Sequence, residues 1–435
     1  MKQTSDDVQA PNDVGSLTRR RFLQLAGATP LALGPLADAC AATSLAFAPA
    51  VFDPSQDSAL VWICGEDAAR VRVEYGSDGT FASGPVATLT KETDFTSAVP
   101  LTGLAPGKEW MYRVVDADNG KPLAEPGRFK TAPASPTPFT FAFSADMEDR
   151  YRPFSIFDAI AARKPDFFLL LGDTIYADHP AKNFSPGVSH YRGKHSSNRK
   201  DSHLQAFLAR HATYAIWDDH ECDDNANPTH PGFRNAFQVF KEYWPCRSAD
   251  AQALYRKFSW AGVDFIVLDT RSFRSPQSMD QVPEKTMLGA AQKAWFMDAL
   301  KSSKAPFKFV VTSVPFQGGG VDTWGNYKNE QQELARFIRA EKIGGVVFLT
   351  GDYHLARDWS NPKAGFREYM AGPLASFTSY QRTPANRDRY EKIGTFHYGD
   401  GFNFGFWRVD PAAGKATIAF VGLRGDTLFE AEISA

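Results

Sequence analysis

The sequence has few cysteines and no excess of either charge. Only four cysteines occur in 435 residues, and none forms a Cys-x-x-Cys pair, which argues against a disulfide scaffold and a thiolate zinc site. The 48 basic and 50 acidic side chains leave a formal net charge of −2, which excludes a general electrostatic footprint for nucleic acid or an anionic membrane. Because 43% of the residues are hydrophobic and 13% aromatic, the chain can fill a sizeable core and is not largely disordered.

The first 44 residues have the layout of an export signal. Three arginines at 19–21 precede a moderately apolar stretch that ends near Ala37, an order typical of exported proteins. Glycines and prolines interrupt this stretch, so it is unsuited to a membrane span. The paired arginines before Phe22 resemble a twin-arginine signal, which implies the twin-arginine export machinery as a partner and a periplasmic or secreted protein. A disordered basic terminus is the alternative. Export would also permit a disulfide between Cys222 and Cys246.

Residues 45–134 are predicted to form a small all-β domain. Strand-forming residues dominate 60–63, 71–75 and 110–115, and Gly-Leu-Ala-Pro-Gly at 103–107 is a turn sequence. This pattern fits an antiparallel sandwich, and the turn with the Tyr-Arg-Val that follows it resembles a fibronectin type III module. No group of catalytic side chains occurs here, so we expect a structural role.

Residues 135–435 are predicted to form an α/β domain, after a stiff proline-rich linker. We expect strands at 139–143, 167–171, 214–217, 265–268, 309–311 and 346–349, and helices at 154–162, 291–300 and 330–342. This alternation predicts a layered fold whose functional side chains lie in loops after the carboxyl ends of the strands.

Carboxylates and imidazoles follow four of these expected strands. Asp146 follows the first, Gly-Asp-x-x-Tyr at 172–176 the second, Asp-Asp-His-Glu at 218–221 the third and Gly-Asp-x-His at 351–354 the last. A single Asp at a strand end is usually a capping or turn residue, but four such ends, two of them with His, favour a shared site. Carboxylate oxygens with one phenol and one or two imidazoles suit two adjacent divalent or trivalent ions.

In this order and spacing, the motifs resemble the metallophosphoesterase (calcineurin-like) superfamily, and more narrowly the alkaline phosphatase D family. Leu-Asp-Thr-Arg at 268–271 adds to the likeness, and residues 366–374 are similar to a segment of that family's phosphodiesterases. The resemblance covers most of the chain. It implies a layered sandwich of two mixed sheets flanked by helices, preceded by the small all-β domain.

The resemblance also implies a role for each metal ligand. Asp173 would bridge two ions, which such sites hold about 3.5–4 Å apart. Tyr176 would bind a ferric ion, with His354 on the same ion. Asp219 and Asp352 would bind the second ion, for which oxygen ligands favour Ca²⁺ or another divalent ion over zinc.

The chain departs from the family pattern near the first ion. The alkaline phosphatase D family often has Cys where this chain has Asp146, so we expect Asp146 to supply a carboxylate that makes the site harder, while Tyr176 still argues for iron. Glu148 stands where other superfamily members have His, and a place behind the ligands or on the surface fits it equally well. No His follows the strand at 309–311, unlike in many relatives.

Three arginines are candidates for binding the substrate. Arg271, expected to be catalytic, and Arg274 would hold the phosphate, because guanidinium matches its geometry; a structural ion pair with Asp269 or a neighbouring helix is an equal alternative. Arg192 belongs to the histidine-rich residues 179–211, for which a substrate-binding wall and a solvated loop are equally compatible with the sequence.

We therefore expect an exported metal-dependent phosphoesterase that hydrolyses monoesters, diesters or both. By the resemblance, a metal-activated hydroxide attacks phosphorus in line, and His220 stays off the metal and protonates the leaving oxygen. A phospholipase-like diesterase is one alternative. Another is a non-catalytic phosphate- or polymer-binding protein on a decayed site, against which the intact Asp173, Asp219 and His220 argue. We expect a monomer.

Overall fold

The computed structural model describes residues 43–435, except 319, 360–363 and 383–393. All but the last two residues of the expected export signal lie outside the described residues. Residues 43–435 form one compact unit. Among the described helices, none combines the length and apolarity needed to cross a bilayer.

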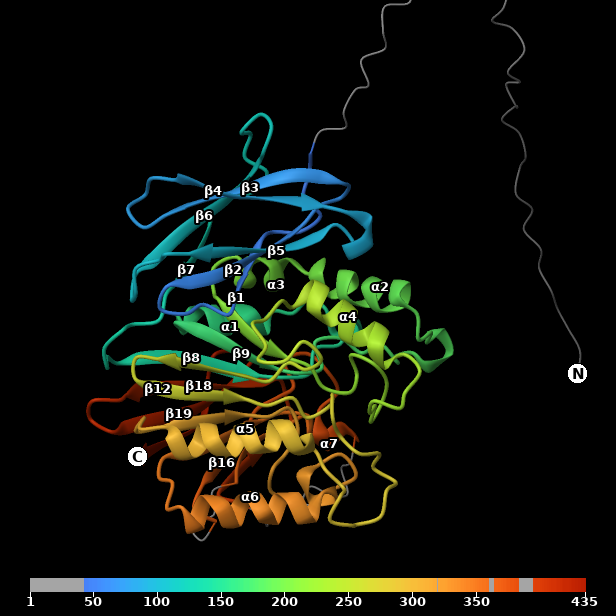
Figure 1. The fold of residues 1–435 in the computed structure, drawn as a ribbon, viewed down its shortest axis with the longest axis vertical. Coiled ribbons are helices and arrows are strands. Elements are labelled where there is room, and N and C mark those ends of the chain that lie inside the picture. The colour runs from blue at the N-terminus through green and yellow to red at the C-terminus, as the bar shows by residue number, and fades with distance from the viewer. Residues whose placement is uncertain (1–42, 319, 360–363, 383–393) are drawn as a thin grey trace, which may run out of the picture. The chain divides into compact units, whose positions relative to one another are not determined.

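Two mixed β-sheets pack face to face (Figure 1). The first has the order β20-β19-β18-β8-β9-β10-β1-β2-β5 and the second β11-β12-β13-β14-β16-β15-β17. In the first sheet the strands after the linker are β8 (Phe139–Ser144), β9 (Phe167–Leu171), β10 (Thr213–Ile216), β18 (Asn403–Asp410), β19 (Lys415–Gly422) and β20 (Thr427–Ser434). The second contains β11 (Arg256–Trp260), β12 (Val263–Val267), β13 (Lys308–Val311), β14 (Val346–Thr350), β15 (Ala356–Asp358), β16 (Arg367–Met370) and β17 (Phe396–Tyr398).

The central strands of both sheets run parallel, so their carboxyl ends share one edge. β9 is buried over its whole length, as expected for a parallel strand covered on both faces. Aromatic residues fill the space between the sheets: the Phe141 ring stacks on Phe167 with centroids 5.3 Å apart and meets Phe309 edge-on at 5.1 Å. The expected layered sandwich of two mixed sheets is confirmed.

Helices cover the outer faces of both sheets. Those on the nine-stranded sheet are α1 (Ile156–Ala162), α2 (Val188–Arg199), α3 (Ser202–Leu208) and α4 (Phe233–Tyr243); those on the seven-stranded sheet are α5 (Gly289–Ser302) and α6 (Lys328–Ala340). A short helix, α7 (Ser379–Arg382), follows β16. The histidine-rich segment forms α2 and α3, so it is a packed helical layer and not the solvated loop that was one expectation.

The N-terminal segment is all-β, as predicted, and it shares a sheet with the rest of the chain. Its strands β1 (Ala50–Phe52), β2 (Ser58–Cys64) and β5 (Thr96–Thr102) extend the nine-stranded sheet, since β1 pairs in parallel with β10. A four-stranded sheet packs on them with β4 (Ala82–Leu89), β3 (Ala69–Gly76), β6 (Glu109–Asp116) and β7 (Gly127–Lys130).

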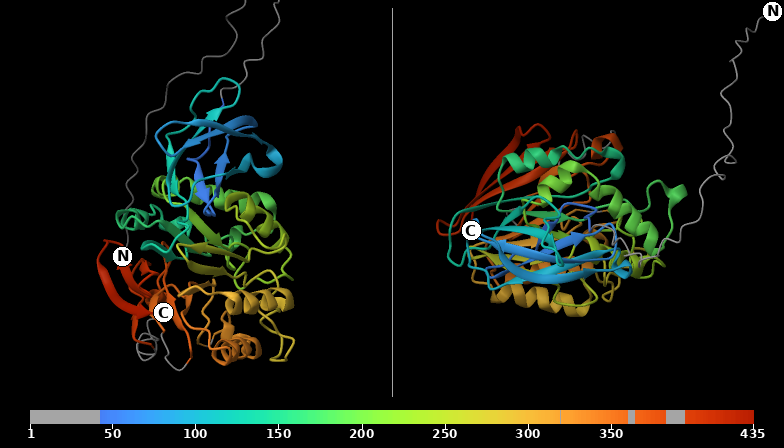
Figure 2. Two further views of the ribbon diagram at one scale, coloured as in Figure 1. Left: turned by 60° about the vertical axis from the view of Figure 1, so that its left-hand side comes forward. Right: turned by 90° about the horizontal axis from the view of Figure 1, so that it is seen from above.

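Alternate residues of β2 serve two cores. Leu60 and Trp62 point into the core under the helices, whereas Val61 and Ile63 point into the core of the N-terminal sandwich. Figures 1 and 2 accordingly show the blue N-terminal strands next to the green helices. The segments 45–134 and 135–435 are therefore joined by a continuous sheet.

The disulfide that export would permit is not formed. Cys222 and Cys246 are both free thiols. The sulfur of Cys222 lies 3.2 Å from Nδ1 of His230, and burial raises the pKa of this thiol to about 12.

Candidate active site

The sharp turns after the parallel strands bring the predicted ligands together. Asp146, Asp173, Asp352 and His354 all have left-handed backbone conformations, with φ between 49° and 71°. Residues with a Cβ seldom adopt this region, and such strain is concentrated at functional sites. These turns and the loops beside them place side chains that follow five strands, β8, β9, β10, β13 and β14, at one site. We call it the acidic cluster: Asp146, Asp173, Tyr176, Asp218, Asp219, Asp322, Asp352 and His354.

The first half of the acidic cluster holds the only phenol and an imidazole of the predicted ligand set. Donor atoms of Asp146, Asp173 and His354 lie within 4.8 Å of one another. The Tyr176 hydroxyl is 2.8 Å from Nε2 of His354. Nδ1 of His354 donates to the carbonyl oxygen of Phe377 at 2.6 Å, which leaves Nε2 facing the carboxylates as a potential metal ligand.

The second half consists of carboxylates. Single oxygens of Asp218, Asp219, Asp322 and Asp352 lie within 4.8 Å of one another. Asp173 also groups with Asp219 and His220 at the same cutoff. Asp173 thus belongs to groups on both sides, which is the position that a bridging ligand requires.

Six buried carboxylate oxygens in the cluster have no hydrogen-bond partner among the described residues. They are both oxygens of Asp146, Oδ2 of Asp173, Oδ2 of Asp218, Oδ1 of Asp219 and Oδ2 of Asp352. Buried polar atoms are almost always paired. Burial, and then the neighbouring carboxylates, raise the pKa of Asp146, Asp173 and Asp352 well above the usual range. A cation would satisfy these oxygens and restore their charged forms, so the side chains fit two hard metal ions.

His220 lies beside the cluster with its ring held in place. Nδ1 of His220 is 2.8 Å from Oδ1 of Asp178, and its ring stacks on Tyr176 with centroids 4.1 Å apart. Burial opposes protonation, but the charge of Asp219 and the hydrogen bond that Nδ1 donates to Asp178 outweigh it and raise the pKa of His220 to about 10. The two carboxylates thus favour the protonated form of this imidazole beside the metal ligands.

Arg271 and Arg274 are neutralised by carboxylates of the protein. Nε of Arg271 donates to Oδ1 of Asp218 at 2.6 Å, and both guanidinium groups pair with Asp322. Burial opposes the charge of Arg271, but Asp218 and Asp322 keep its pKa well above the usual range. The ion-pair alternative therefore describes both arginines, with partners other than the expected Asp269, because Asp322 folds back onto them. Neither has the free guanidinium expected of a phosphate clamp.

Two other predicted positions lie behind or away from the acidic cluster. Arg192 donates from Nε to Glu242 at 2.8 Å and from Nη2 to the carbonyl of Glu92, so its guanidinium makes a structural ion pair, and its role in substrate binding stays a prediction. Glu148 is buried, and its Oε1 is 2.6 Å from Nε of Arg150. It belongs to none of the ligand groups and corresponds to the alternative of a place behind the ligands.

Several residues that support the site were not selected from the sequence. The carboxylate of Glu221 accepts hydrogen bonds from the backbone N–H groups of Asp173, Thr174 and Asp218 at 3.2, 2.5 and 2.8 Å. Gly372 allows the backbone to approach Asp146, since a Cβ at this glycine would lie 2.3 Å from Oδ2 of that residue. Glu221 and Gly372 both belong to motifs on which the family resemblance depends, and these motifs could have identified them from the sequence.

A cleft of about 350 Å³ opens onto the cluster. Its lining includes His220, Asp224, Asp352, His354 and Phe377. The exposed side chain of Val321, with 66% of its surface accessible, stands at the same cleft. A substrate in the cleft would touch the carboxylates and His220 together.

Comparisons with known proteins agree with this arrangement. A family model described as PhoD-like phosphatase matches residues 140–420, and one described as PhoD-like phosphatase, N-terminal domain, matches residues 41–133. Alkaline phosphatase D of Bacillus subtilis (strain 168) is 26% identical to this chain in an alignment of 420 positions that covers 77% of this chain and 71% of the relative.

Two solved structures share the fold. A structure described as that of PhoD aligns with a TM-score of 0.77 and 22% identity over 90% of this chain and 89% of that one. Purple acid phosphatase PPD1 from seeds of yellow lupin (Lupinus luteus) aligns with a TM-score of 0.67 and 12% identity over 89% of this chain and 74% of that one. Because the first family model matches well over half of its length, this chain belongs to the PhoD-like phosphatase family and is an alkaline phosphatase D-like hydrolase, a metal-dependent phosphoesterase.

Proposed function

We propose that this protein is an exported phosphodiesterase that uses one ferric ion and one or more calcium ions. The observation that carries the proposal is the position of Asp173, shared between a group with His354 and a group with Asp219. A carboxylate in this position can hold two ions close together.

The proposed metals follow from the donor atoms on each side. Tyr176 and His354 supply a phenol and an imidazole 2.8 Å apart, and a phenol deprotonates most readily on a trivalent ion. Burial, then Asp173 and Asp146, raise the pKa of the Tyr176 phenol well above its usual range, so only a strong cation would offset them. On the other side the donors are carboxylate oxygens, which Ca²⁺ prefers.

When bound, the ions would supply positive charge for the phosphoryl oxygens and acidify a water molecule. The protein's own contribution is the proton on His220. Because Asp178 engages Nδ1, Nε2 is the nitrogen that can donate to the leaving-group oxygen in the cleft. The hydrogen bonds of Glu221 fix the turn that carries Asp173 relative to the turn that carries Asp218. The side chains are therefore positioned before the substrate binds.

The charge of the cleft favours diesters over monoesters. Its lining residues, all within the described part of the chain, include no lysine or arginine, and Asp224 is among them. A monoester dianion would face this carboxylate with only the metal ions and the imidazolium of His220 to balance its charge, whereas a diester carries one negative charge. We therefore propose a higher kcat/KM for diesters.

Asp173→Ala tests the two-metal site. We expect the purified variant to lose both metals, measured by elemental analysis, and nearly all hydrolysis of bis-nitrophenyl phosphate. Iron at Tyr176 should give the wild-type protein a visible phenolate-to-iron absorption band that Tyr176→Phe removes. Full metal content in Asp173→Ala would contradict the shared ligand, and a band that survives in Tyr176→Phe would contradict iron on this phenol.

The substrate preference is tested by Asp224→Asn. Its kcat/KM for nitrophenyl phosphate should rise relative to that for bis-nitrophenyl phosphate, because one repulsive charge is removed. An unchanged ratio would remove the electrostatic argument for diesters.

Export has its own test, since it depends on residues outside the described structure. Replacing Arg19 and Arg20 together with lysine should retain the protein in the cytoplasm, as measured by cell fractionation. Normal export of this variant would contradict a twin-arginine signal.

A further inference from the structure

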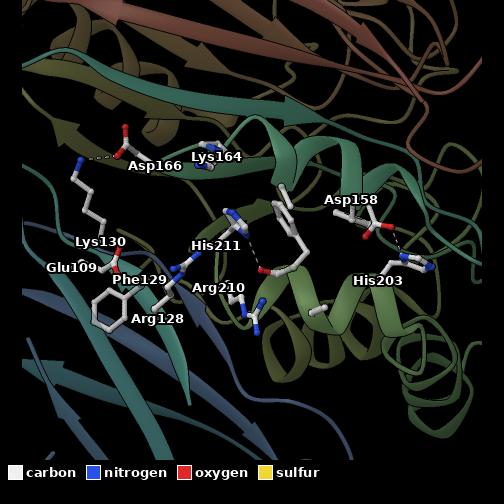
Figure 3. Close-up of a pocket in the computed structure, with 15 residues that line it drawn as sticks. Glu109, Arg128, Phe129, Lys130, Asp158, Lys164, Asp166, His203, Arg210 and His211 are labelled. Atoms are coloured by element: carbon white, nitrogen blue, oxygen red, sulfur yellow. Dashed lines mark hydrogen bonds and ion pairs between the residues drawn. The ribbon is translucent and has the colours of Figure 1, made fainter. Parts of the chain in front are cut away.

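A second cavity, of about 580 Å³, shares no lining residue with the cleft at the acidic cluster. It lies where the N-terminal strand β7 meets the helices α1 and α3 (Figure 3). We call it the junction cavity. Pockets of this size accommodate small ligands and occur preferentially where two structural units meet.

Ion pairs stand at two ends of the junction cavity. Lys130 lies 2.6 Å from Asp166, and Nδ1 of His203 lies 2.9 Å from Asp158. Figure 3 shows the first pair at the left and the second at the right. Lys130 and Asp166 therefore compensate each other, and His203 compensates Asp158 when its ring is protonated.

The cations between the two pairs have no such balance. Arg128, Arg210 and Lys164 line the cavity, and none has a side-chain hydrogen-bond or ion-pair partner among the residues that the structure describes. The one remaining unpaired carboxylate is Glu109. The unpaired groups thus carry three positive charges against one negative charge.

A backbone hydrogen bond places Arg128 and Arg210 on neighbouring segments of the chain. The N–H of Arg128 on β7 donates to the carbonyl of Ala209 after α3 at 3.0 Å. Ala209 directly precedes Arg210 in the chain. Figure 3 shows both near His211. Burial is the main cause that lowers the pKa of His211 to about 4, and the positive charges of Arg128 and Arg210 lower it further.

Buried aromatic rings form the floor of the cavity. Phe157 and Phe207 line it, with ring centroids 5.0 Å apart. The His211 ring stacks on Phe207 at 4.5 Å. A ligand would therefore meet an apolar floor and a basic rim.

We propose that the junction cavity binds a small organic anion, whose phosphate or carboxylate group lies between Arg128 and Arg210 and whose apolar part packs on Phe157 and Phe207. Guanidinium groups match both kinds of anion. Because the ligand would touch β7 and α3 together, its binding would stabilise the contact between the N-terminal strands and the helices. This site is separate from hydrolysis and does not depend on the proposed substrate.

The test uses the metal-loaded protein with ¹³C-labelled histidine, in which His211 is assigned with the variant H211Q. Phenylphosphonate and benzoate are titrated separately. His211 reports on the junction cavity, whereas inhibition of bis-nitrophenyl phosphate hydrolysis reports on binding at the acidic cluster. We expect at least one probe to shift the His211 signal to saturation.

The double variant R128S/R210S should weaken this binding by at least about tenfold, given the strength of hydrogen bonds to charged groups. Both side chains are exposed and unpaired, so the variant should fold and retain wild-type hydrolysis. R424S, which removes an exposed arginine elsewhere, should bind as the wild type does. A response to phenylphosphonate alone assigns a phosphate ligand, and a response to benzoate alone a carboxylate ligand. No shift of His211, or equal affinity in R128S/R210S, would overturn the proposal.

Discussion

The left-handed conformation of four residues of the acidic cluster destabilises the folded protein, and without metal ions no ligand binding offsets this loss of stability. Asp352→Gly removes both the strained φ of 71° and a buried carboxylate without a partner for Oδ2. We expect the free energy of unfolding of the metal-free variant to exceed that of the metal-free wild type by about 1 kcal/mol or more. The metal-loaded variant should lose activity. Denaturant unfolding measures the first effect.

The control for this prediction is Lys342→Gly. Lys342 is exposed, has a similar φ of 53° and lies in the turn before β14. Lys342→Gly should raise the free energy of unfolding only by relieving the left-handed backbone, and it should leave hydrolysis unchanged. A metal-free Asp352→Gly less stable than the wild type would contradict the strain argument.

His220→Ala separates proton donation from metal binding. As a general acid, His220 should be worth about 10²–10⁴-fold for alkyl esters and much less for nitrophenyl esters, whose leaving group barely needs a proton. His220 also groups with Asp173 and Asp219, so metal ligation is the competing role. The two rate losses are compared at wild-type metal content; equal losses, or loss of metal, would contradict the acid role.

Single residues of the site were predictable where a motif fixed them. Asp173, Tyr176, Asp219, Asp352 and His354 follow strands that hydrophobic runs marked, and the shared edge of parallel strands brings such positions together. Asp322 was not predictable in this way. It lies well beyond the end of β13, and only the fold of the intervening loop brings it to Arg271 and Arg274.

At the scale of elements, Asp322 fastens the loop after β13 to the rest of the site. It pairs with two buried arginines that come from the loop after β12. Asp322→Asn leaves these arginines with less charge compensation, so we expect a loss of about 3–5 kcal/mol of stability and weaker metal retention. Asp280→Asn, at an exposed carboxylate, should change neither quantity. Wild-type stability in Asp322→Asn would contradict the fastening role.

α2 shows why the sequence did not reveal the helical layer near the site. Its buried residues are Tyr191, His195, Asn198 and Arg199, so its inner face has no hydrophobic periodicity to detect. Asn198 nevertheless donates to the carbonyls of Met147 and Thr174 at 2.9 and 2.8 Å. The helix thus supports two ligand-bearing turns through polar contacts that only the tertiary structure provides. α5 and α6, with apolar positions in helical register, were predictable.

At the scale of the whole molecule, buried His195 makes the fold sensitive to acid. Burial, and then Arg199, lower its pKa from 6.5 to about 3. Between these values the unfolded chain binds more protons than the folded one, so the free energy of unfolding falls as the pH decreases. One such group contributes at most about 1.4 kcal/mol per pH unit. His195→Phe, which keeps a ring against Tyr243, should flatten the pH dependence of denaturant unfolding between pH 6 and 4.

The control for acid sensitivity is His203→Gln. Its hydrogen bond with Asp158 raises the pKa of His203, so this group stabilises the fold at low pH. Its removal should make the protein slightly more sensitive to acid, the opposite direction. An unchanged pH dependence in His195→Phe would contradict the assignment.

The continuous nine-stranded sheet has a consequence for dividing the chain. β10 pairs with β9 on one side and with β1 on the other, and Trp62 of β2 fills the core under the helices. A chain that begins at residue 135 would expose the outer edge of β10 and an unfilled core, a surface open to edge-to-edge polymerisation. Supplied together as two separate polypeptides, residues 43–134 and 135–435 should instead reassemble by fragment complementation and recover hydrolysis. Soluble, active protein from residues 135–435 alone would contradict this dependence.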